Sequence, residues 1–246
     1  MAEVAKANKT TGNDIVKTRV VAAIPCYNTQ EHIAEVIAKT KKYVDVVIVI
    51  DDGSTDKTAE VAKKAGATVI AHIKNEGYGG AIKSCFAVAR TSEADVLVII
   101  DGDGQHNPDE IPRLLDTISL GNADVVIGSR FLDASEKIPM YRKFGIGVIT
   151  FLWNFGAKVK VSDTQSGFRA YSKTMIQSMN FYENGMSISI EIIEKARMAR
   201  RKFKEVPVTC SYENNNSNIS ITAFKQGISV ALSVMRIRLK SRFIKV

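Results

Sequence analysis

The chain has 246 residues, of which 45% are hydrophobic and 24% charged, an ordinary balance for a globular protein. This length suffices for one large domain or two small ones with a full hydrophobic core. No apolar run approaches the length of about 18 residues that a transmembrane helix needs. Segment 1–18 is polar and lacks the apolar stretch and cleavage site of a secretory signal, so we expect a flexible leader.

The net charge of +8 is concentrated at the end of the chain. No acidic residue follows Glu213, whereas six basic residues do: Lys225, Arg236, Arg238, Lys240, Arg242 and Lys245. A basic and partly apolar segment of this kind indicates contact with an anionic partner, either a membrane surface or a phosphorylated substrate. The alternative is a solvated basic helix.

Short apolar runs alternate with amphipathic stretches through the first half of the chain. The apolar runs predict strands at 20–24, 44–50, 67–72, 96–100 and 125–127. Helical spacing between them predicts helices at 29–41, 54–65, 79–90 and 109–118, the second capped by Ser54 or Thr55 and stopped by Gly66. Continuous apolar strands alternating with helices are typical of a mostly parallel sheet covered on both faces, a doubly wound α/β fold.

The pattern loosens in the second half. Segment 138–158 is rich in glycine and aromatic residues, 186–200 has a helical rhythm, 204–212 is a late strand, and 224–243 is a basic amphipathic helix. No linker separates two domains. We therefore expect one catalytic domain over 19–222, followed by a basic helix over 223–246 that contacts a membrane surface. The scattered cysteines Cys26, Cys85 and Cys210 are expected to be buried reduced thiols of a cytoplasmic protein.

Polar motifs follow the first, second and fourth predicted strands. They are Pro25-Cys26-Tyr27-Asn28, Asp51-Asp52-Gly53-Ser54 and Asp101-Gly102-Asp103-Gly104. In such sheets ligands bind beyond the carboxyl ends of the strands, so these motifs predict one shared site.

Asp101 and Asp103 predict a site for a hard cation. Gly102 and Gly104 permit a turn in which both carboxylates converge, and Gln105 supplies a further oxygen. Mg²⁺ or Mn²⁺ prefers such ligands and commonly holds a substrate phosphate on its other positions. The neighbouring His106, a single imidazole beside a turn, is more typical of a surface or supporting group.

The other candidates each have a simpler alternative. Asp52 can accept hydrogen bonds from a ribose or a base, or can serve as a turn or capping residue. Arg130 and Arg142 can each clamp a phosphate, or can form a salt bridge with a nearby acid. The glycine-rich turn 75–81 can approach a phosphate or be a plain turn, and the polar segment 163–169 has the composition of a site loop.

These motifs, in this order, resemble the family 2 glycosyltransferases of the GT-A fold, and among them the polyprenyl (dolichyl) phosphate sugar synthases. The stretches that carry the resemblance are AAIPCYN, VIVIDDGSTDKT, VIIDGDGQHNPDEIPRLL, DVVIGSRF and DTQSGFRAYS. They cover most of residues 20–173. The resemblance implies a Rossmann-like, mostly parallel central sheet with helices on both faces in a single domain.

The resemblance also implies residue roles. The nucleotide-sugar pocket would be formed by Pro25, Tyr27, Asn28, Asp52, Asp101 and Gly102, with Arg169 and Lys225 as further phosphate ligands. Asp101, Asp103 and Gln105 would hold Mg²⁺ or Mn²⁺ on the diphosphate. Asp103, Arg130 and Arg142 would act in catalysis, the two arginines on phosphates of the donor or acceptor.

The implied reaction is inverting transfer of a sugar from a nucleoside diphosphate to a polyprenyl or dolichyl phosphate. The DDGSTD turn favours UDP-glucose or UDP-N-acetylglucosamine, with GDP-mannose as a possible donor. Many relatives carry transmembrane helices after the catalytic domain and this chain does not, so its access to the membrane would come from the basic amphipathic end, from a partner, or from an anchor outside this sequence. We expect a protein bound peripherally to the cytoplasmic face of the membrane, with no nucleic-acid partner.

Two alternatives stay open. The same donor site could serve a glycan or another acceptor that is not a lipid. A non-enzymatic receiver domain also places acidic residues beyond parallel strands, although the chain is about twice the usual receiver length.

Overall fold

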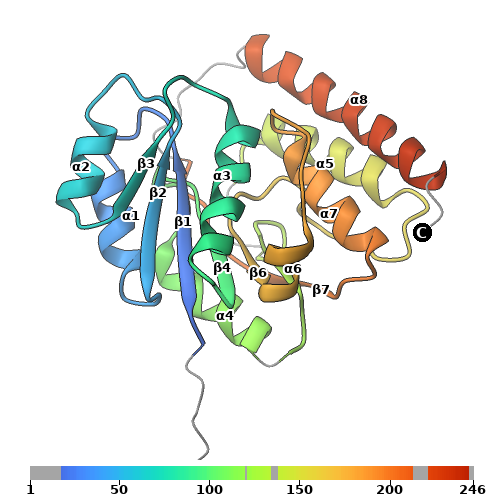
Figure 1. Ribbon diagram of the computed structural model, residues 1–246. Coiled ribbons are helices and arrows are strands. Elements are labelled where there is room, and N and C mark those ends of the chain that lie inside the picture. The colour runs from blue at the N-terminus through green and yellow to red at the C-terminus, as the bar shows by residue number, and fades with distance from the viewer. Residues whose placement is uncertain (1–17, 120, 134–137, 213–220, 244–246) are drawn as a thin grey trace, which may run out of the picture.

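The computed structural model describes residues 18–119, 121–133, 138–212 and 221–243. Its centre is a seven-stranded sheet in the order β3-β2-β1-β4-β6-β5-β7, and every pairing is parallel except the two made by β6. The strands are β1 Val20–Cys26, β2 Val46–Asp51, β3 Thr68–Ala71, β4 Val96–Ile99, β5 Val125–Ser129, β6 Arg169–Ser172 and β7 Phe203–Pro207. The predicted single-domain, mostly parallel α/β fold is confirmed (Figure 1).

The helices cover both faces of this sheet (Figure 1). They are α1 Ile33–Thr40, α2 Thr58–Lys64, α3 Tyr78–Thr91, the 3₁₀ turn η1 Pro108–Glu110, α4 Ile111–Ser119, α5 Met140–Asn154, α6 Lys173–Ser178, α7 Ile188–Met198 and α8 Ile221–Phe243. Helices α1, α2 and α4 pack on one face, and α3, α5, α6, α7 and α8 on the other.

Alternate residues of β1 serve the two cores. Val21 and Ala23 face the layer that contains α3, whereas Ala22 and Ile24 face the layer that contains α1. All four are fully buried. A strand covered on both sides must be apolar at every position, which is why these strands appear in the sequence as continuous hydrophobic runs.

One strand escapes the sequence pattern. β6 follows the polar segment 163–169, is only four residues long, and runs antiparallel between β4 and β5. A strand this short is stable here because β4 and β5 supply hydrogen bonds along both of its edges. Its reversal brings segment 163–169 to the edge of the sheet where β4 and β5 end.

The predicted cap of α2 is wrong. The helix starts at Thr58 with Lys57 at the N-cap position, and Ser54 instead accepts a hydrogen bond from the backbone N–H of Asn28 at 2.9 Å. The predicted stop is confirmed, because Gly66 follows the helix with φ of +81°, a conformation that favours glycine.

The second half contains more helix than its loose pattern indicates. Segment 138–158 holds the fifteen-residue α5, and α8 packs against α5 and α7 with Val230 and Val234 buried. The basic C-terminal helix is therefore joined to the catalytic core along one face. In the described part of the chain, no helix combines the length and the apolarity needed to cross a bilayer.

Phe86 on α3 is a test of the core on the α3 side. Its ring is fully buried and lies 4.9 Å from that of Tyr171 and 4.8 Å from that of Phe181. We expect Phe86→Ala to lower the free energy of unfolding by about 3–5 kcal/mol, because it removes apolar contacts and leaves a cavity. Denaturant unfolding measures this change. Phe151→Ala, at a ring that is 66% exposed, is the matched control and should change stability by less than about 0.5 kcal/mol.

Candidate active site

The reversed strand gathers the polar loops at one edge of the sheet. Ile99 at the end of β4 and Ile127 in β5 both pair with Arg169, the first residue of β6. The loops that leave β4 and β5 therefore meet the loop 163–169 that enters β6. The loops after β1 and β2 end at the same edge because these strands are parallel to β4.

The acidic pair lies in the turn after β4. Asp103 accepts a hydrogen bond from the backbone N–H of Gln105 at 3.0 Å, which closes the turn. The backbone N–H of Gly102 donates to the carbonyl oxygen of Pro25 at 3.2 Å, and a Cβ atom added at Gly102 would overlap the thiol of Cys26. Glycine at this position therefore lets the acidic turn lie directly against the end of β1.

Asp101 lacks a hydrogen-bonding partner on one oxygen. Its Oδ1 is buried and has no hydrogen bond among the described residues. Its Oδ2 is so close to Gly167 that a Cβ atom at that position would overlap it. The glycine of segment 163–169 thus makes room for the carboxylate, while Oδ1 is left for a partner from outside the chain.

The electrostatics of the pair favour a bound cation. Burial first, and the adjacent charge of Asp103 second, raise the pKa of Asp101 to about 7, against opposing effects of Tyr78, Arg130 and Arg169. Burial also raises the pKa of Asp103, and His32 and Arg142 are among the groups that oppose the rise. Two carboxyl groups that resist ionising together are stabilised in the charged form by a nearby positive ion.

The donor set fits Mg²⁺ or Mn²⁺ with several positions left for other ligands. The described residues contain no group of three or more His, Cys, Asp and Glu side chains that could enclose a metal. Two carboxylates with a partnerless buried oxygen suit a hard cation that completes its shell with water and phosphate oxygens. Asp101 and Asp103 are therefore the residues that could hold it.

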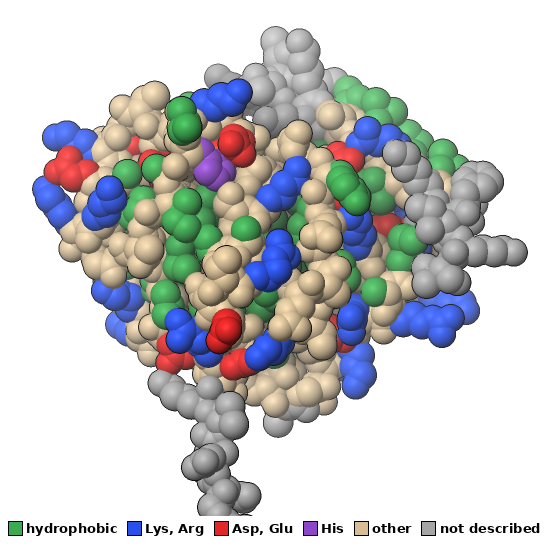
Figure 2. Space-filling view, viewed as in Figure 1, with side chains coloured by type: hydrophobic (Ala, Val, Ile, Leu, Met, Phe, Trp, Pro, Cys, Tyr) green, Lys and Arg blue, Asp and Glu red, His purple; other side chains and the backbone are tan. Residues whose placement is uncertain are grey.

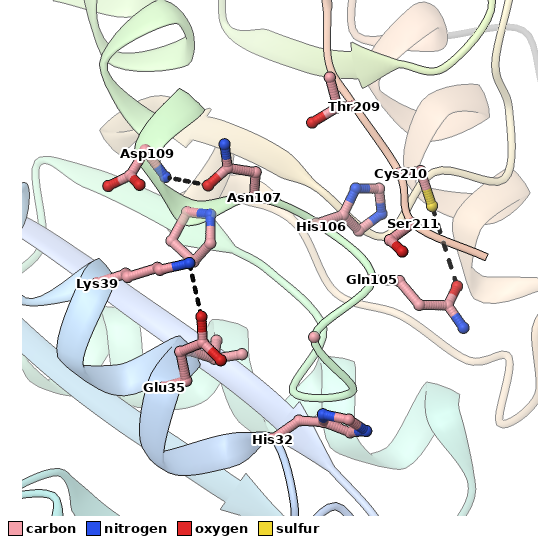
Figure 3. Close-up of a pocket in the computed structure, with 13 residues that line it drawn as sticks. His32, Glu35, Lys39, Gln105, His106, Asn107, Asp109, Thr209, Cys210 and Ser211 are labelled. Atoms are coloured by element: carbon pink, nitrogen blue, oxygen red, sulfur yellow. Dashed lines mark hydrogen bonds and ion pairs between the residues drawn. The ribbon is translucent and has the colours of Figure 1, made fainter. Parts of the chain in front are cut away.

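Gln105 contacts the pair through its backbone. Its side-chain Oε1 lies 4.0 Å from the sulfur of Cys210, on the wall of a groove of about 440 Å³ (Figure 3). The groove lies between α1, the turn 104–109 and segment 209–211. The metal role of Gln105 stays a prediction.

His106 is a buried wall residue. It pairs with Cys210 in an isolated antiparallel bridge, and its ring lies 5.5 Å from that of Phe168. Burial and the charge of Arg130 lower its pKa to about 4, so it is neutral near pH 7. A neutral imidazole with this pKa is a poor general base at neutral pH.

Arg130 is bound by an acid of the chain. Its Nε and Nη2 donate to the two oxygens of Asp163 at 2.7 and 2.9 Å, and both side chains are buried. Burial alone would raise the pKa of Asp163, but the hydrogen bonds and charge of Arg130 outweigh it and lower the pKa. Arg130 therefore forms the salt bridge with a nearby acid that the sequence left open as an alternative to a phosphate contact. Its predicted contact with a phosphate is untested and would have to use the N–H groups that Asp163 does not bind, on Nη1 and Nη2.

Glu205 supports this ion pair from β7. Its carboxylate accepts hydrogen bonds from the backbone N–H groups of Ser162 and Asp163 at 2.8 and 3.1 Å. The acid of β7 therefore fixes the backbone of the loop on which Asp163 stands.

Arg142 and Arg169 supply positive charge on two sides of the acidic pair. Arg142, in the first turn of α5, lies over the ring of Tyr212 at 5.2 Å, and its charge opposes the rise in the pKa of Asp103. Arg169 is buried, donates to the carbonyl oxygens of Ser189 and Thr164 at 3.2 and 2.8 Å, and its charge opposes the rise in the pKa of Asp101. No salt bridge to an acid is found for either arginine among the described contacts.

The first two loops are tied together. Asn28 has φ of +52°, and its side-chain oxygen accepts a hydrogen bond from the backbone N–H of Thr55 at 2.9 Å. Tyr27 is about half exposed beside it. These contacts hold the loop after β1 next to the loop after β2, as a shared pocket for a nucleotide requires.

Asp52 already accepts three hydrogen bonds. They come from the ring Nδ1 of His72 at 2.7 Å and from the backbone N–H groups of Glu76 and Gly77, each at 2.9 Å. The turn role that the sequence leaves open for Asp52 is therefore present, and its contact with a nucleotide stays a prediction. The side chain of Lys225 lies outside the described residues.

Four site residues are missing from the sequence predictions: Tyr78, His72, Gly167 and Glu205. The sequence offers a signal for three of them. His72 lies at the end of a predicted strand, where ligands bind in such sheets, and Tyr78 and Gly167 lie in the segments 75–81 and 163–169 whose composition is typical of site loops. Glu205 has no such signal, because its contacts depend on the pairing of β7 with β5.

A family model described as glycosyl transferase family 2 matches residues 21–179, a span that holds the acidic pair, Arg130, Arg142 and segment 163–169 and leaves out α7, β7 and segment 209–212. The chain belongs to this family. It is a glycosyltransferase, as the motifs predict, and the alternative hypothesis of a non-enzymatic receiver domain is wrong.

Two named relatives of this glycosyltransferase are archaeal proteins. It is 29% identical to a dolichyl-phosphate hexose transferase of Haloferax volcanii, over 88% of this chain and 92% of the relative. It is 29% identical to a UDP-N-acetylglucosamine–dolichyl-phosphate N-acetylglucosaminyltransferase of Methanococcus voltae, over 77% and 84%. The predicted similarity to dolichyl-phosphate sugar synthases is confirmed.

The fold is shared with solved structures. Glucosyl-3-phosphoglycerate synthase of Mycobacterium tuberculosis, in complex with Mn²⁺, UDP-glucose and phosphoglyceric acid, superposes with a TM-score of 0.71 at 19% identity. The match covers 89% of this chain and 79% of that one.

The acidic pair predicts a dependence of stability on pH that Mn²⁺ should reverse. The folded protein keeps a proton on Asp101 up to about pH 7, whereas the unfolded chain loses it near the ordinary value of 3.8. Without metal, the contribution of Asp101 to stability should therefore fall as pH rises from about 4 to about 7. If Mn²⁺ binds the ionised pair, the upward shift it causes in the melting temperature should grow between pH 6 and 8.

Melting curves with and without Mn²⁺ measure both effects. Asp101→Asn should flatten the metal-free pH profile and abolish most of the Mn²⁺ shift, whereas Asp116→Asn, at an exposed position on α4, should leave both unchanged. A Mn²⁺ shift of wild-type size in Asp101→Asn would remove this carboxylate from the metal site.

Proposed function

We propose that this glycosyltransferase moves a hexose or N-acetylhexosamine from a nucleoside diphosphate sugar, with UDP as the favoured nucleotide, to a polyprenyl or dolichyl phosphate. The observation that carries the proposal is the acidic pair Asp101 and Asp103, in which Oδ1 of Asp101 is buried without a partner and which is acted on by the charges of Arg142 and Arg169. An anionic diphosphate and an anionic acceptor both suit such a site.

The proposed donor and metal rest on the residues of the site and on what similar proteins are named for or were crystallised with. The DDGSTD turn after β2 favours UDP sugars, and the Methanococcus relative is named for UDP-N-acetylglucosamine. The Mycobacterium synthase was crystallised with Mn²⁺ and UDP-glucose, which supports a divalent cation of the Mg²⁺ or Mn²⁺ type. When bound, such a cation stabilises the negative charge of the departing diphosphate.

The residues of the chain would act mainly by positioning. A phosphate monoester acceptor is largely ionised near pH 7, since its second pKa is about 6. It needs little help from a general base, which agrees with a site whose buried His106 has a pKa of about 4. Arg142 would orient the attacking phosphate oxygen, and Arg130 and Arg169 would shape the positive wall behind the diphosphate.

A lipid acceptor is favoured by an apolar face beside the site, formed by exposed side chains of α5 and α8. It comprises Met140, Phe144, Val148 and Phe151 on α5, Phe155 directly after α5, and Ile228, Leu232, Met235 and Leu239 on α8. Their spacings of three and four residues place each set along one side of its helix. Figure 2 shows the part of this face that lies over α8.

Basic residues accompany this face. Lys143, Lys158 and Lys160 are exposed on α5 and in the loop after it. Arg236 pairs with Glu183, and Arg238 donates hydrogen bonds to the carbonyl oxygens of Trp153 and Phe155. We propose that the paired helices lie in the surface of an anionic membrane, in agreement with the predicted location at the cytoplasmic face.

A soluble acceptor remains the second candidate. The Mycobacterium synthase was crystallised with phosphoglyceric acid, a small phosphorylated acid. An assay with both acceptor types separates the two.

Transfer of labelled sugar tests the reaction. We expect Mn²⁺-dependent transfer from UDP-glucose or UDP-N-acetylglucosamine to a short polyprenyl phosphate, in preference to GDP-mannose. Asp103→Ala should lower the rate by about a thousandfold or more while the protein stays folded, because stabilisation of the leaving group by a metal is worth several kcal/mol. Asp116→Ala on α4 is the control and should keep wild-type activity. Full activity of Asp103→Ala would contradict the proposed role of Asp103 in holding the metal during sugar transfer.

Charge placed on the apolar face tests the membrane contact. The double variant Phe151→Asp, Leu232→Asp should bind anionic vesicles at least about tenfold more weakly, since each side chain is worth about 1.5–3 kcal/mol on burial. Its activity on a water-soluble phosphate acceptor should survive. Ile70→Asp, on the edge strand β3 at the other end of the sheet, should leave vesicle binding unchanged. Vesicle sedimentation measures the difference, and equal binding by the two variants would contradict the proposal.

A further inference from the structure

A chain of three hydrogen-bonded side chains joins β2, β3 and α3 at the edge of the site. Oδ1 of Asp52 lies 2.7 Å from Nδ1 of His72, and Nε2 of His72 lies 2.9 Å from Oγ of Ser84. His72 follows β3, and Ser84 stands in the middle of α3. None of the roles discussed above involves Ser84, and His72 has appeared only as a hydrogen-bond donor to Asp52.

The chain determines how His72 presents its two nitrogens. A carboxylate can only accept, so Nδ1 of the ring donates to Asp52, while Nε2 is hydrogen-bonded to the hydroxyl of Ser84. The imidazole is therefore held at both ends, and its short bond fixes the rotation of the Asp52 carboxylate.

The loop after His72 encloses the same carboxylate. Glu76 donates to Oδ1 and Gly77 to Oδ2, each from its backbone N–H at 2.9 Å. Gly77 has φ of +81°, and Gly53 packs so closely on Asn75 that an added Cβ atom would lie 2.7 Å from its backbone nitrogen. Both glycines are needed for this close wrapping.

Three of about four acceptor positions on Asp52 are thus occupied. Oδ1 carries two bonds and Oδ2 carries one, which leaves a single position on Oδ2. Only 5% of the side chain is exposed, so little room is left around it for further partners.

We propose that His72, held by Ser84, is a positioning residue that fixes Asp52 with one free acceptor position and so selects a uracil base. Uracil offers one N–H, at N3, between two carbonyl groups. Guanine offers two adjacent donors, N1–H and the 2-amino group, which require both oxygens of a carboxylate. This selection rests on the proposed function, since it assumes that a nucleoside diphosphate binds at this edge of the sheet.

Two substitutions at His72 separate positioning from simple packing. The side-chain amide of asparagine can replace Nδ1, whereas that of glutamine reaches the position of Nε2. We expect His72→Asn to bind UDP within about threefold of wild type, and His72→Gln to bind it about tenfold or more weakly, since a hydrogen bond to a charged group is worth about 1.5–3 kcal/mol. Ser84→Ala should weaken UDP binding less than His72→Gln, and Thr91→Ala, at the far end of α3, should not change it.

Titration calorimetry of the full chain with UDP or GDP in the presence of Mn²⁺ is the measurement, with melting temperatures recorded for each variant. We expect wild type to bind UDP at least about tenfold more tightly than GDP, and His72→Gln to lose most of this ratio. Equal UDP affinities for the Asn and Gln variants, whether like wild type or equally weakened, would overturn the role of His72. Tighter binding of GDP would overturn the base selection but leave the proposed function standing, whereas binding of neither nucleotide would overturn the proposed function itself.

Discussion

Strand β6 runs against both of its neighbours, so its first residue, Arg169, lies opposite the ends of β4 and β5. If β6 were parallel, the segment that precedes it would enter the sheet from the other edge, far from Asp101. The reversal places Asp163 on Arg130 and Gly167 on Asp101. Each of these contacts joins segment 163–169 to a loop that follows a strand. The acidic pair, its positive surroundings and the buried ion pair all depend on this single antiparallel insertion.

The charges around the acidic pair are divided between structure and binding. Asp163 neutralises Arg130 with two hydrogen bonds, and a buried bidentate pair of this kind loses several kcal/mol if either partner is removed. Arg169 is held by carbonyl oxygens, and Arg142 lies over an aromatic ring, so their charge is left to act on the carboxylates. Even so, the pKa of Asp101 stays near 7. The positive charges of Arg130 and Arg169 therefore do not offset the burial of this carboxyl group, a condition under which a cation in direct contact would stabilise its charged form.

The sequence predicts those parts of the molecule in which a local pattern has one physical cause. Strands β1, β2 and β4 are apolar on both faces, and the acids after β2 and β4 follow from their position at the strand ends. Strand β6 is not predicted, because Arg169–Ser172 has no apolar pattern of its own and is stabilised by the strands on either side. The cap of α2 is misplaced for a similar reason, since Ser54 is used by Asn28 in a contact between loops. The partners of Arg130 and Asp52 could be stated only as alternatives, because pairing between distant residues has no signature in the linear order.

Helix α5 connects the reaction site to the apolar face. Its first turn carries Arg142, whose charge acts on Asp103, while Phe144 and Phe151 of the same helix point outward and are largely exposed. A rigid helix sets the distance between a phosphate held by Arg142 and the surface into which the aromatic side chains would insert. A polyprenyl phosphate in a membrane has its charged phosphate at the surface and its hydrocarbon chain below it, which matches the order of Arg142 and the aromatic side chains along α5. The arginine and the aromatic residues of α5 would therefore bind opposite ends of one acceptor, and α8, packed along α5 through Val230 and Val234, would keep the helix in that orientation.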